Sequence, residues 1–179
     1  GLTDCKEGKL ASHFNAVIAH HTNHDPSRAP DGKHTLYLYN FAPLELKNTG
    51  PLGGRDIDGW NSEIRDQYKE WMMGEYSKYC TNMTSDNVIA SAAESPADMA
   101  EWSPSFQKGD IFGIGNWIHQ YLGRRPTPAL AQYAVPGAEG LYLAGPFMHP
   151  GGAVTGGGRA TAMKILDDAG ADISKVMSI

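Results

Sequence analysis

Residues 140–166 read GLYLAGPFMHPGGAVTGGGRATAMKIL, and this stretch decides the fold class. The apolar run from Gly140 to Gly145 predicts a buried strand. A turn rich in proline and glycine follows, and the composition of residues 153–169 predicts a helix that ends at Gly170. A strand that leads through such a turn into a helix directs free backbone N–H groups, and the positive end of the helix dipole, at a ligand.

This geometry leaves two interpretations open. In the first, the helix N-terminus binds an anion or a cofactor. In the second, the turn only packs the helix closely against the strand and holds no ligand. Glycines 151 and 152 would let the backbone approach a ligand, and glycines 156, 157 and 158 would let the helix pack tightly. A flavin ring would use such a site, because its N1/C2=O edge becomes negative on reduction and needs hydrogen-bond donors.

The earlier part of the chain predicts strands over residues 13–22 and 34–41, joined by a loop that contains a Pro-Asp-Gly turn. Apolar residues at three- and four-residue steps predict an amphipathic helix over residues 60–79, capped by Asp58 or Asn61. Residues 87–92 predict a short strand, and Ser95 followed by Pro96 predicts a helix start. The expected fold class is α/β, with an α+β substrate portion built on a mixed sheet.

Composition excludes several classes of function. The formal charge of −5 argues against a nucleic-acid partner, since phosphate binding requires a basic surface. No apolar run approaches the roughly 18 to 20 residues of a transmembrane segment. Two cysteines are too few for a disulfide scaffold, so we expect free thiols and a cytoplasmic protein.

The C-terminal stretch resembles the corresponding motif of phytoene desaturase-type flavoproteins, within the wider amine oxidase-like FAD superfamily. The shared pattern is Gly-Leu-Tyr-Leu-x-Gly, a short loop, and His-Pro-Gly-Gly-x-Val-x-Gly before a helix of small residues. The resemblance covers most of the chain in collinear order and is strongest from residue 95 onward. Its further matches are 25–34, Ser95, Pro96, Asp98, 109–112, Gln120, Arg125, Pro126, Pro128, Tyr133 and Pro136.

The resemblance implies a substrate-binding portion over residues 1–135 and the last strand and helix of a Rossmann-like FAD-binding domain over residues 136–179. It implies hydride transfer from an apolar or aromatic organic substrate to flavin N5. The residues that it implies for cofactor binding are Gly145, Pro146, His149, Gly151, Gly152, Ala153, Val154 and Thr155. Two departures, Pro146-Phe147-Met148 in the loop and Ala153 where glycine is frequent, leave the individual ring contacts undetermined.

Several polar residues are candidates for the reaction itself. His149 would be a hydrogen-bond donor in the flavin loop, a catalytic base, or a covalent tether for the flavin. His149 and His119 are the candidates for proton transfer, because histidine titrates near neutral pH. Asn116, Gln120 and His21 are candidates for the substrate pocket. For residues 116–120 the alternative is a polar rim on a helix. The pair Arg124 and Arg125 would steer a phosphate or an anionic substrate, or else lie in solvent or in an interface.

A dinucleotide-binding fingerprint is absent from the sequence. G-x-G-x-x-G after a strand grips the ADP part of FAD, but Gly113-Ile114-Gly115 continues as Asn-Trp-Ile and fails the pattern. We therefore expect a second polypeptide, or the other product of a processed precursor, to supply the ADP-binding half.

Two further functions remain as alternatives. One is a non-catalytic subunit or isolated domain that binds a partner and holds no flavin. The other is a metal protein that uses His20, His21 and His24, although the predicted strand contradicts a helical i, i+4 pair and no carboxylate framework accompanies these histidines.

Overall fold

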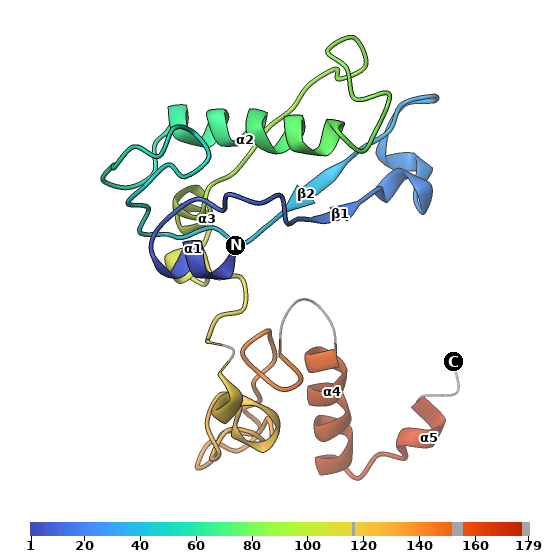
Figure 1. Ribbon diagram of the computed structural model, residues 1–179. Coiled ribbons are helices and arrows are strands. Elements are labelled where there is room, and N and C mark those ends of the chain that lie inside the picture. The colour runs from blue at the N-terminus through green and yellow to red at the C-terminus, as the bar shows by residue number, and fades with distance from the viewer. Residues whose placement is uncertain (116, 152–155, 177–179) are drawn as a thin grey trace. The chain divides into compact units, whose positions relative to one another are not determined.

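The computed structural model describes residues 1–115, 117–151 and 156–176. The chain divides into two compact units, Gly1–Met99 and Ala100–Ile179. Figure 1 shows the helices and strands of each unit. No helix among the described residues has both the length and the apolar character that spanning a bilayer requires.

The first unit contains a two-stranded antiparallel sheet. Strand β1 (Val17–Ala19) pairs with β2 (Tyr37–Tyr39), with Ile18 opposite Leu38. Both strands are shorter than predicted, because the chain leaves the sheet in two 3₁₀ turns, η1 (His21–Asn23) and η2 (Pro26–Arg28). Asp25 caps η2 by accepting a hydrogen bond from the Ser27 N–H at 3.2 Å.

Helix α2 (Ser62–Ser77) confirms the predicted amphipathic helix and runs alongside the two strands (Figure 1). Asn61 is its cap, and its Oδ1 accepts a hydrogen bond from the Ile64 N–H at 2.9 Å. The buried residues of the helix, Ile64, Tyr68, Met72 and Tyr76, recur at four-residue steps. The first three pack in one core cluster with Leu10 and Leu46.

The prediction of a strand over residues 87–92 is wrong. The N–H groups of Asn87 and Val88 both bond to the Thr84 carbonyl, so this segment starts in a turn and continues without regular structure. Helix α3 (Pro96–Trp102) begins where predicted. Ser95 and Asp98 cap it reciprocally: the Ser95 N–H donates to Asp98 Oδ2 at 2.8 Å, and Ser95 Oγ accepts from the Asp98 N–H at 3.2 Å. The unit also contains helix α1 (Leu2–Lys6).

The second unit is dominated by helix α4 (Gly156–Asp168), which corresponds to the predicted C-terminal helix (Figure 1). It ends at Gly170, whose φ of +66° permits the N–H groups of Gly170 and Ala171 to bond back to Asp167 and Leu166. The other helical segments are η3 (Gln107–Gly109), η4 (Ile118–Gln120), η5 (Leu122–Arg124) and α5 (Ile173–Val176).

The predicted strand from Gly140 to Gly145 forms only one short antiparallel pairing. The Leu143 N–H donates to the Tyr133 carbonyl at 2.8 Å, and the Val135 N–H donates to the Leu141 carbonyl at 3.0 Å. This pairing joins residues on both sides of the predicted boundary at 135/136, and the compact units divide between Met99 and Ala100. The division into a substrate-binding and an FAD-binding portion stays a prediction. A Rossmann-like sheet around this strand stays a prediction.

Candidate functional site: a glycine-rich loop over a buried arginine

The predicted cofactor loop lies against the first turn of α4. Gly145 accepts a hydrogen bond from the Met148 N–H at 3.1 Å, and Met148 is fully buried. A Cβ at Gly145 would lie 2.8 Å from Cε1 of Phe147, so the ring occupies the space that a side chain would need. A Cβ at Gly157 would lie 3.1 Å from the Gly145 carbonyl oxygen. Glycine at both positions therefore permits the loop to approach the helix closely.

A completely buried arginine lies beneath this loop. Arg125 has no exposed side-chain surface, and its Nη2 donates to the Pro146 carbonyl at 2.9 Å. Its Nη1 donates to the Gly115 carbonyl at 3.2 Å, and a longer contact of 3.5 Å reaches the Phe112 carbonyl. None of the carboxylates in the described ranges forms an ion pair with Arg125. In the part of the chain that the structure describes, only the dipoles of backbone carbonyls balance its charge. This arrangement is uncommon, because burying a charge without an ion-pair partner is costly.

Gly151 packs directly on the guanidinium. Its φ is +82°, and a Cβ at this position would lie 2.9 Å from Arg125 Nε. The position therefore requires glycine both for its backbone conformation and for the space that the arginine takes.

Two polar atoms at this loop are buried without a partner. Of the side-chain atoms in the described part of the chain, Arg125 Nε, His149 Nδ1 and Thr35 Oγ1 are buried and lack a hydrogen bond. The His149 backbone is held by the Tyr133 hydroxyl, which donates to its carbonyl at 3.2 Å. Since buried polar groups are nearly always paired, the unpaired Nδ1 of His149 in the loop, close to the unpaired Arg125 beneath it, indicates a place where a ligand completes the bonding.

Helix α4 is tied to the strand segment before the loop. The Thr161 hydroxyl lies 2.8 Å from the Leu143 carbonyl and 3.0 Å from the Gly157 carbonyl. At the far end of the helix the Tyr142 hydroxyl donates to Asp168 at 2.8 Å, and Lys164 pairs with the same carboxylate. Lys164, and then Tyr142, lower the pKa of Asp168 by hydrogen bonding.

The structure brings four of the predicted cofactor-binding residues together: Gly145, Pro146, His149 and Gly151. The remaining four, Gly152, Ala153, Val154 and Thr155, lie outside the described residues, as does Asn116. His119 is exposed on η4. Gln120 is half-buried, and its Oε1 lies 3.4 Å from where a Cβ of Gly115 would be, near a carbonyl that Arg125 binds.

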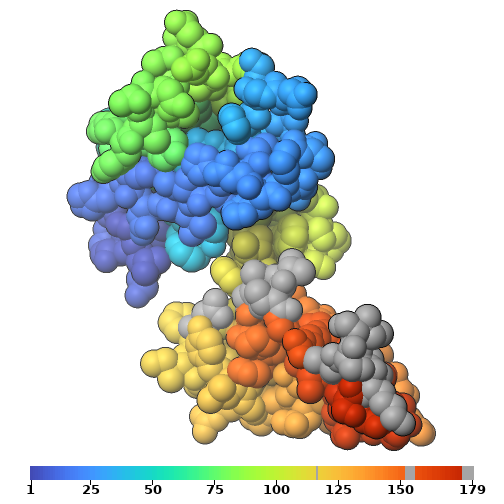
Figure 2. All heavy atoms as spheres, turned by 90° about the vertical axis from the view of Figure 1, so that its right-hand side faces the viewer, coloured from blue at the N-terminus to red at the C-terminus, as the bar shows by residue number. Residues whose placement is uncertain are grey.

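The predicted pocket residue His21 lies in the first unit, where its ring is exposed and contacts Tyr37 at a centroid distance of 5.7 Å. Its neighbour His20 instead lines a cavity of about 1120 Å³ in that unit. Residues 32–42, α2 and residues 82–96 form the other walls, and Figure 2 shows the blue and green parts of the unit in contact.

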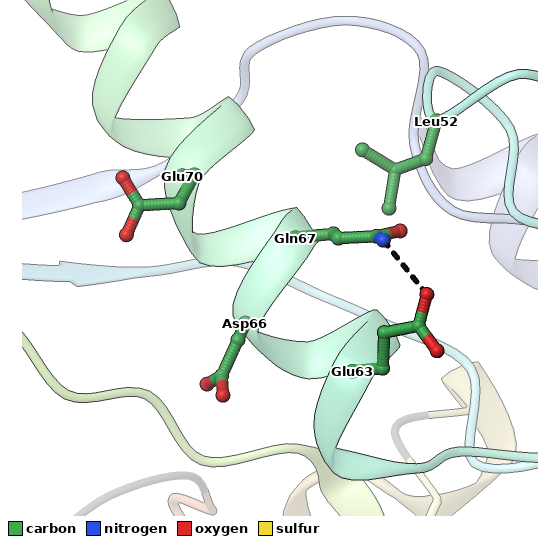
Figure 3. Close-up of a pocket in the computed structure, with 5 residues that line it drawn as sticks. All are labelled: Leu52, Glu63, Asp66, Gln67 and Glu70. Carbon is green, nitrogen blue, oxygen red and sulfur yellow. Dashed lines mark hydrogen bonds between the residues drawn. The ribbon is translucent and has the colours of Figure 1, made fainter.

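A shallow hollow on the outer side of α2 is lined by acidic residues (Figure 3). Gln67 Nε2 donates to Glu63 Oε1 at 3.0 Å, and both side chains turn toward Leu52, whereas Asp66 and Glu70 point away. Asp66 and Glu70 pair with Arg65 and Lys69 at 3.3 Å. The described residues contain no group of three histidine, cysteine or acidic side chains arranged to hold a metal ion.

Arg125 is the residue whose role the sequence did not reveal. The pair Arg124–Arg125 pointed to a phosphate, a substrate or the solvent, yet Arg124 is exposed and Arg125 is fully buried. Nothing in the spacing distinguishes the two, because the difference arises from two loop segments, 112–115 and 146–151, that converge on the second arginine.

Comparison with known proteins gives distant relatives. The chain is 30% identical over 146 residues to pyridine nucleotide-disulfide oxidoreductase domain-containing protein 2 of Mus musculus, covering 80% of this chain and 23% of the relative. It is 28% identical over 143 residues to the protein of the same name from Rattus norvegicus, covering 79% of this chain and 23% of the relative. The chain thus spans about a quarter of these relatives. No protein-family profile matches it, and no solved structure matches it.

These relatives are named as oxidoreductase-domain proteins, which supports an oxidoreductase relationship for the chain. Their name does not single out the phytoene desaturase group.

Proposed function

We propose that this chain forms the flavin-closing part of an FAD-dependent oxidoreductase that acts on a small apolar or aromatic organic substrate. The observation that carries the proposal is the loop Gly145–Gly151, which holds the unpaired, buried Nδ1 of His149 and packs on the unpaired Nε of Arg125. In the sequence the loop leads toward the N-terminal turn of α4. The oxidoreductase names of the relatives support the same reaction class. The phytoene desaturase-like subtype rests on the collinear sequence motifs.

The residues present fit a flavin. The buried Nδ1 of His149 in the loop lacks a hydrogen-bond partner, so it can donate or accept one bond to a ring edge. The fixed positive charge of Arg125 lies under the loop, and the positive end of the α4 dipole lies beside it. Both favour a ring edge that gains negative charge on reduction.

FAD, when bound, would supply a hydride acceptor at its N5 atom. The chain's own contribution is to position the flavin ring and to exclude water from it. Arg125 fixes the loop backbone through the Pro146 carbonyl, and Tyr133 fixes it through the His149 carbonyl. His149 would use its unpaired Nδ1 to bond to the ring, while the buried Met148 keeps water out of the loop.

We further propose that the ADP-binding half comes from polypeptide outside these 179 residues. Strand and helix side chains that a complete α/β domain would cover are exposed here: Leu141 by 52%, Ile165 by 42% and Met163 by 39%. The match covers only 23% of the length of the mouse relative, which agrees with this proposal. A non-catalytic subunit without flavin would expose the same side chains, so the flavin itself is the discriminating observation.

The test is native purification of the chain with its bound partners, followed by intact-mass analysis and a visible absorbance scan. We expect stoichiometric flavin together with a polypeptide segment that carries G-x-G-x-x-G. His149→Gln should weaken flavin retention about three- to tenfold, the effect of one lost hydrogen bond, whereas the matched variant of the exposed His119, His119→Gln, should not. A colourless assembly that takes up no added FAD, although the segment is present, would refute the proposal.

A further inference from the structure

We propose that the cavity of the Gly1–Met99 unit binds a neutral small molecule with an apolar body and one hydroxyl or carbonyl group, which Tyr76 and His20 recognise. Binding in this cavity does not depend on flavin. Its identification as the substrate site rests on the function proposed above.

The cavity is large enough for a small molecule and has mainly apolar walls. Its volume of about 1120 Å³ compares with the larger small-molecule pockets, which reach roughly 1000 Å³. Methionine and aliphatic side chains from three separate segments line it, and flexible thioethers adapt to the shape of a ligand. These side chains are Leu36, Leu38, Met72, Met73, Met83 and Ile89.

One wall carries a cluster of hydrogen-bonding groups. The Tyr76 hydroxyl lies 3.3 Å from His20 Nε2, and both residues line the cavity together with Cys80. The adjacent Cys80 side chain raises the pKa of Tyr76 through a hydrogen bond, with burial contributing next. The hydroxyl therefore stays protonated near neutral pH, and it can donate or accept one hydrogen bond.

The charges around the cavity favour a neutral ligand. Arg65 pairs with Asp66 at 3.3 Å and with Asp98 at 3.6 Å, and Lys69 pairs with Glu70 at 3.3 Å. The other polar groups of the inner wall are uncharged: Asn40 Nδ2 donates to the Tyr68 hydroxyl at 3.0 Å. The other charged residues of the lining, Lys33, Asp86 and Glu94, are exposed, so water screens their charges. Among the described residues a charged ligand would find no buried, unpaired counter-charge here, whereas one hydroxyl or carbonyl would match the Tyr76 cluster.

The two cysteines provide the assay. Cys80 lines the cavity, whereas Cys5 lies elsewhere in the unit, with its Sγ 3.3 Å from the Phe41 carbonyl. The full-length chain is incubated with iodoacetamide and either 2-naphthol or naphthalene, and mass spectrometry measures the alkylation rate of each cysteine. We expect 2-naphthol to protect Cys80 but not Cys5, with an apparent affinity about three- to tenfold higher than that of naphthalene.

The variant Tyr76→Phe keeps the ring and removes the hydroxyl. This variant should lower the affinity for 2-naphthol to that for naphthalene. The control is Tyr79→Phe, at a tyrosine that is 75% exposed and lies outside the cavity, and it should leave the affinities for both probes unchanged. An unaltered Cys5 rate shows that the variants remain folded.

Equal protection by the two probes, or no protection of Cys80, would overturn the inference. The readout needs no flavin. Loss of protection and loss of flavin binding are therefore distinct failures, one of this inference and one of the proposed function.

Discussion

Replacing Arg125 by methionine tests the role of the buried guanidinium. Methionine fills similar space, so the change removes the hydrogen bonds at 2.9 Å and 3.2 Å and leaves the carbonyls of Pro146 and Gly115 without a donor. A carbonyl shielded from water costs about 1–3 kcal/mol when it loses its donor, and this cost applies to the half-buried Pro146. Water can replace the donor at the exposed Gly115, and the third contact, at 3.5 Å, is too long to count. Removing a buried charge returns part of this cost. We expect a net loss of about 2 kcal/mol in local stability.

The assay is amide hydrogen exchange followed by mass spectrometry on the full chain. A loss of about 2 kcal/mol corresponds to roughly thirtyfold faster exchange in peptides over 143–151. The peptide over α2, in the other unit, serves as an internal reference. The matched control is Arg124→Met, which changes an exposed arginine and should alter stability by less than about 0.5 kcal/mol. If both variants exchange at the same rate, Arg125 does not hold the loop, and the reasoning fails.

Three further predictions follow from the glycines and from the α3 cap. Gly158→Ala should stabilise α4 by about 0.5–1 kcal/mol, because no atom lies within 4 Å of the added Cβ. Gly157→Ala should not show this gain, because its Cβ would lie 3.1 Å from the Gly145 carbonyl oxygen. The thermal unfolding temperatures of the two variants test the difference. Gly151→Ala should destabilise the second unit by about 1–3 kcal/mol, since φ is +82° and the Cβ meets Arg125; unchanged exchange over 143–151 would contradict this. Hydrogen bonds from Ser95 lower the pKa of Asp98 below 3.8 in the folded state. Wild type should therefore be more stable than Asp98→Asn above about pH 4, and this difference should vanish as the pH falls through the folded-state pKa. Denaturant titrations between pH 7 and pH 3 that show a constant difference in unfolding free energy would exclude the effect.

The helices were predictable because their signals are local. Periodic apolar residues and Asn61 specify α2, the Ser95–Asp98 pair specifies the start of α3, and Gly170 specifies the end of α4. The strand predictions succeeded less well. A strand needs a partner, and residues 87–92 are rich in apolar residues but pair with no strand in the part of the chain that the structure describes.

The candidate site was partly predictable. Its glycines indicate a close approach of the backbone to a neighbouring group. Two of them, Gly145 and Gly151, have positive φ values, which favour glycine. The burial of Arg125 and the lining of the cavity by His20 instead of His21 both depend on contacts between segments far apart in sequence. Spacing along the chain carries no information about such contacts.

The bonding of Arg125 has a consequence for how this protein can evolve. The described hydrogen-bond partners of its guanidinium are all backbone carbonyl oxygens, so they do not depend on the side chains at positions 112, 115 and 146. Positions 112 and 146 are free to vary as long as the backbone keeps its path, whereas position 125 is not. Position 115 is restricted for another reason, because a Cβ there would lie 2.5 Å from Trp117 Nε1. In an alignment of homologues, the arginine would be invariant among variable neighbours. Methods that infer contacts from correlated substitutions would therefore fail to detect the interactions that organise the loop.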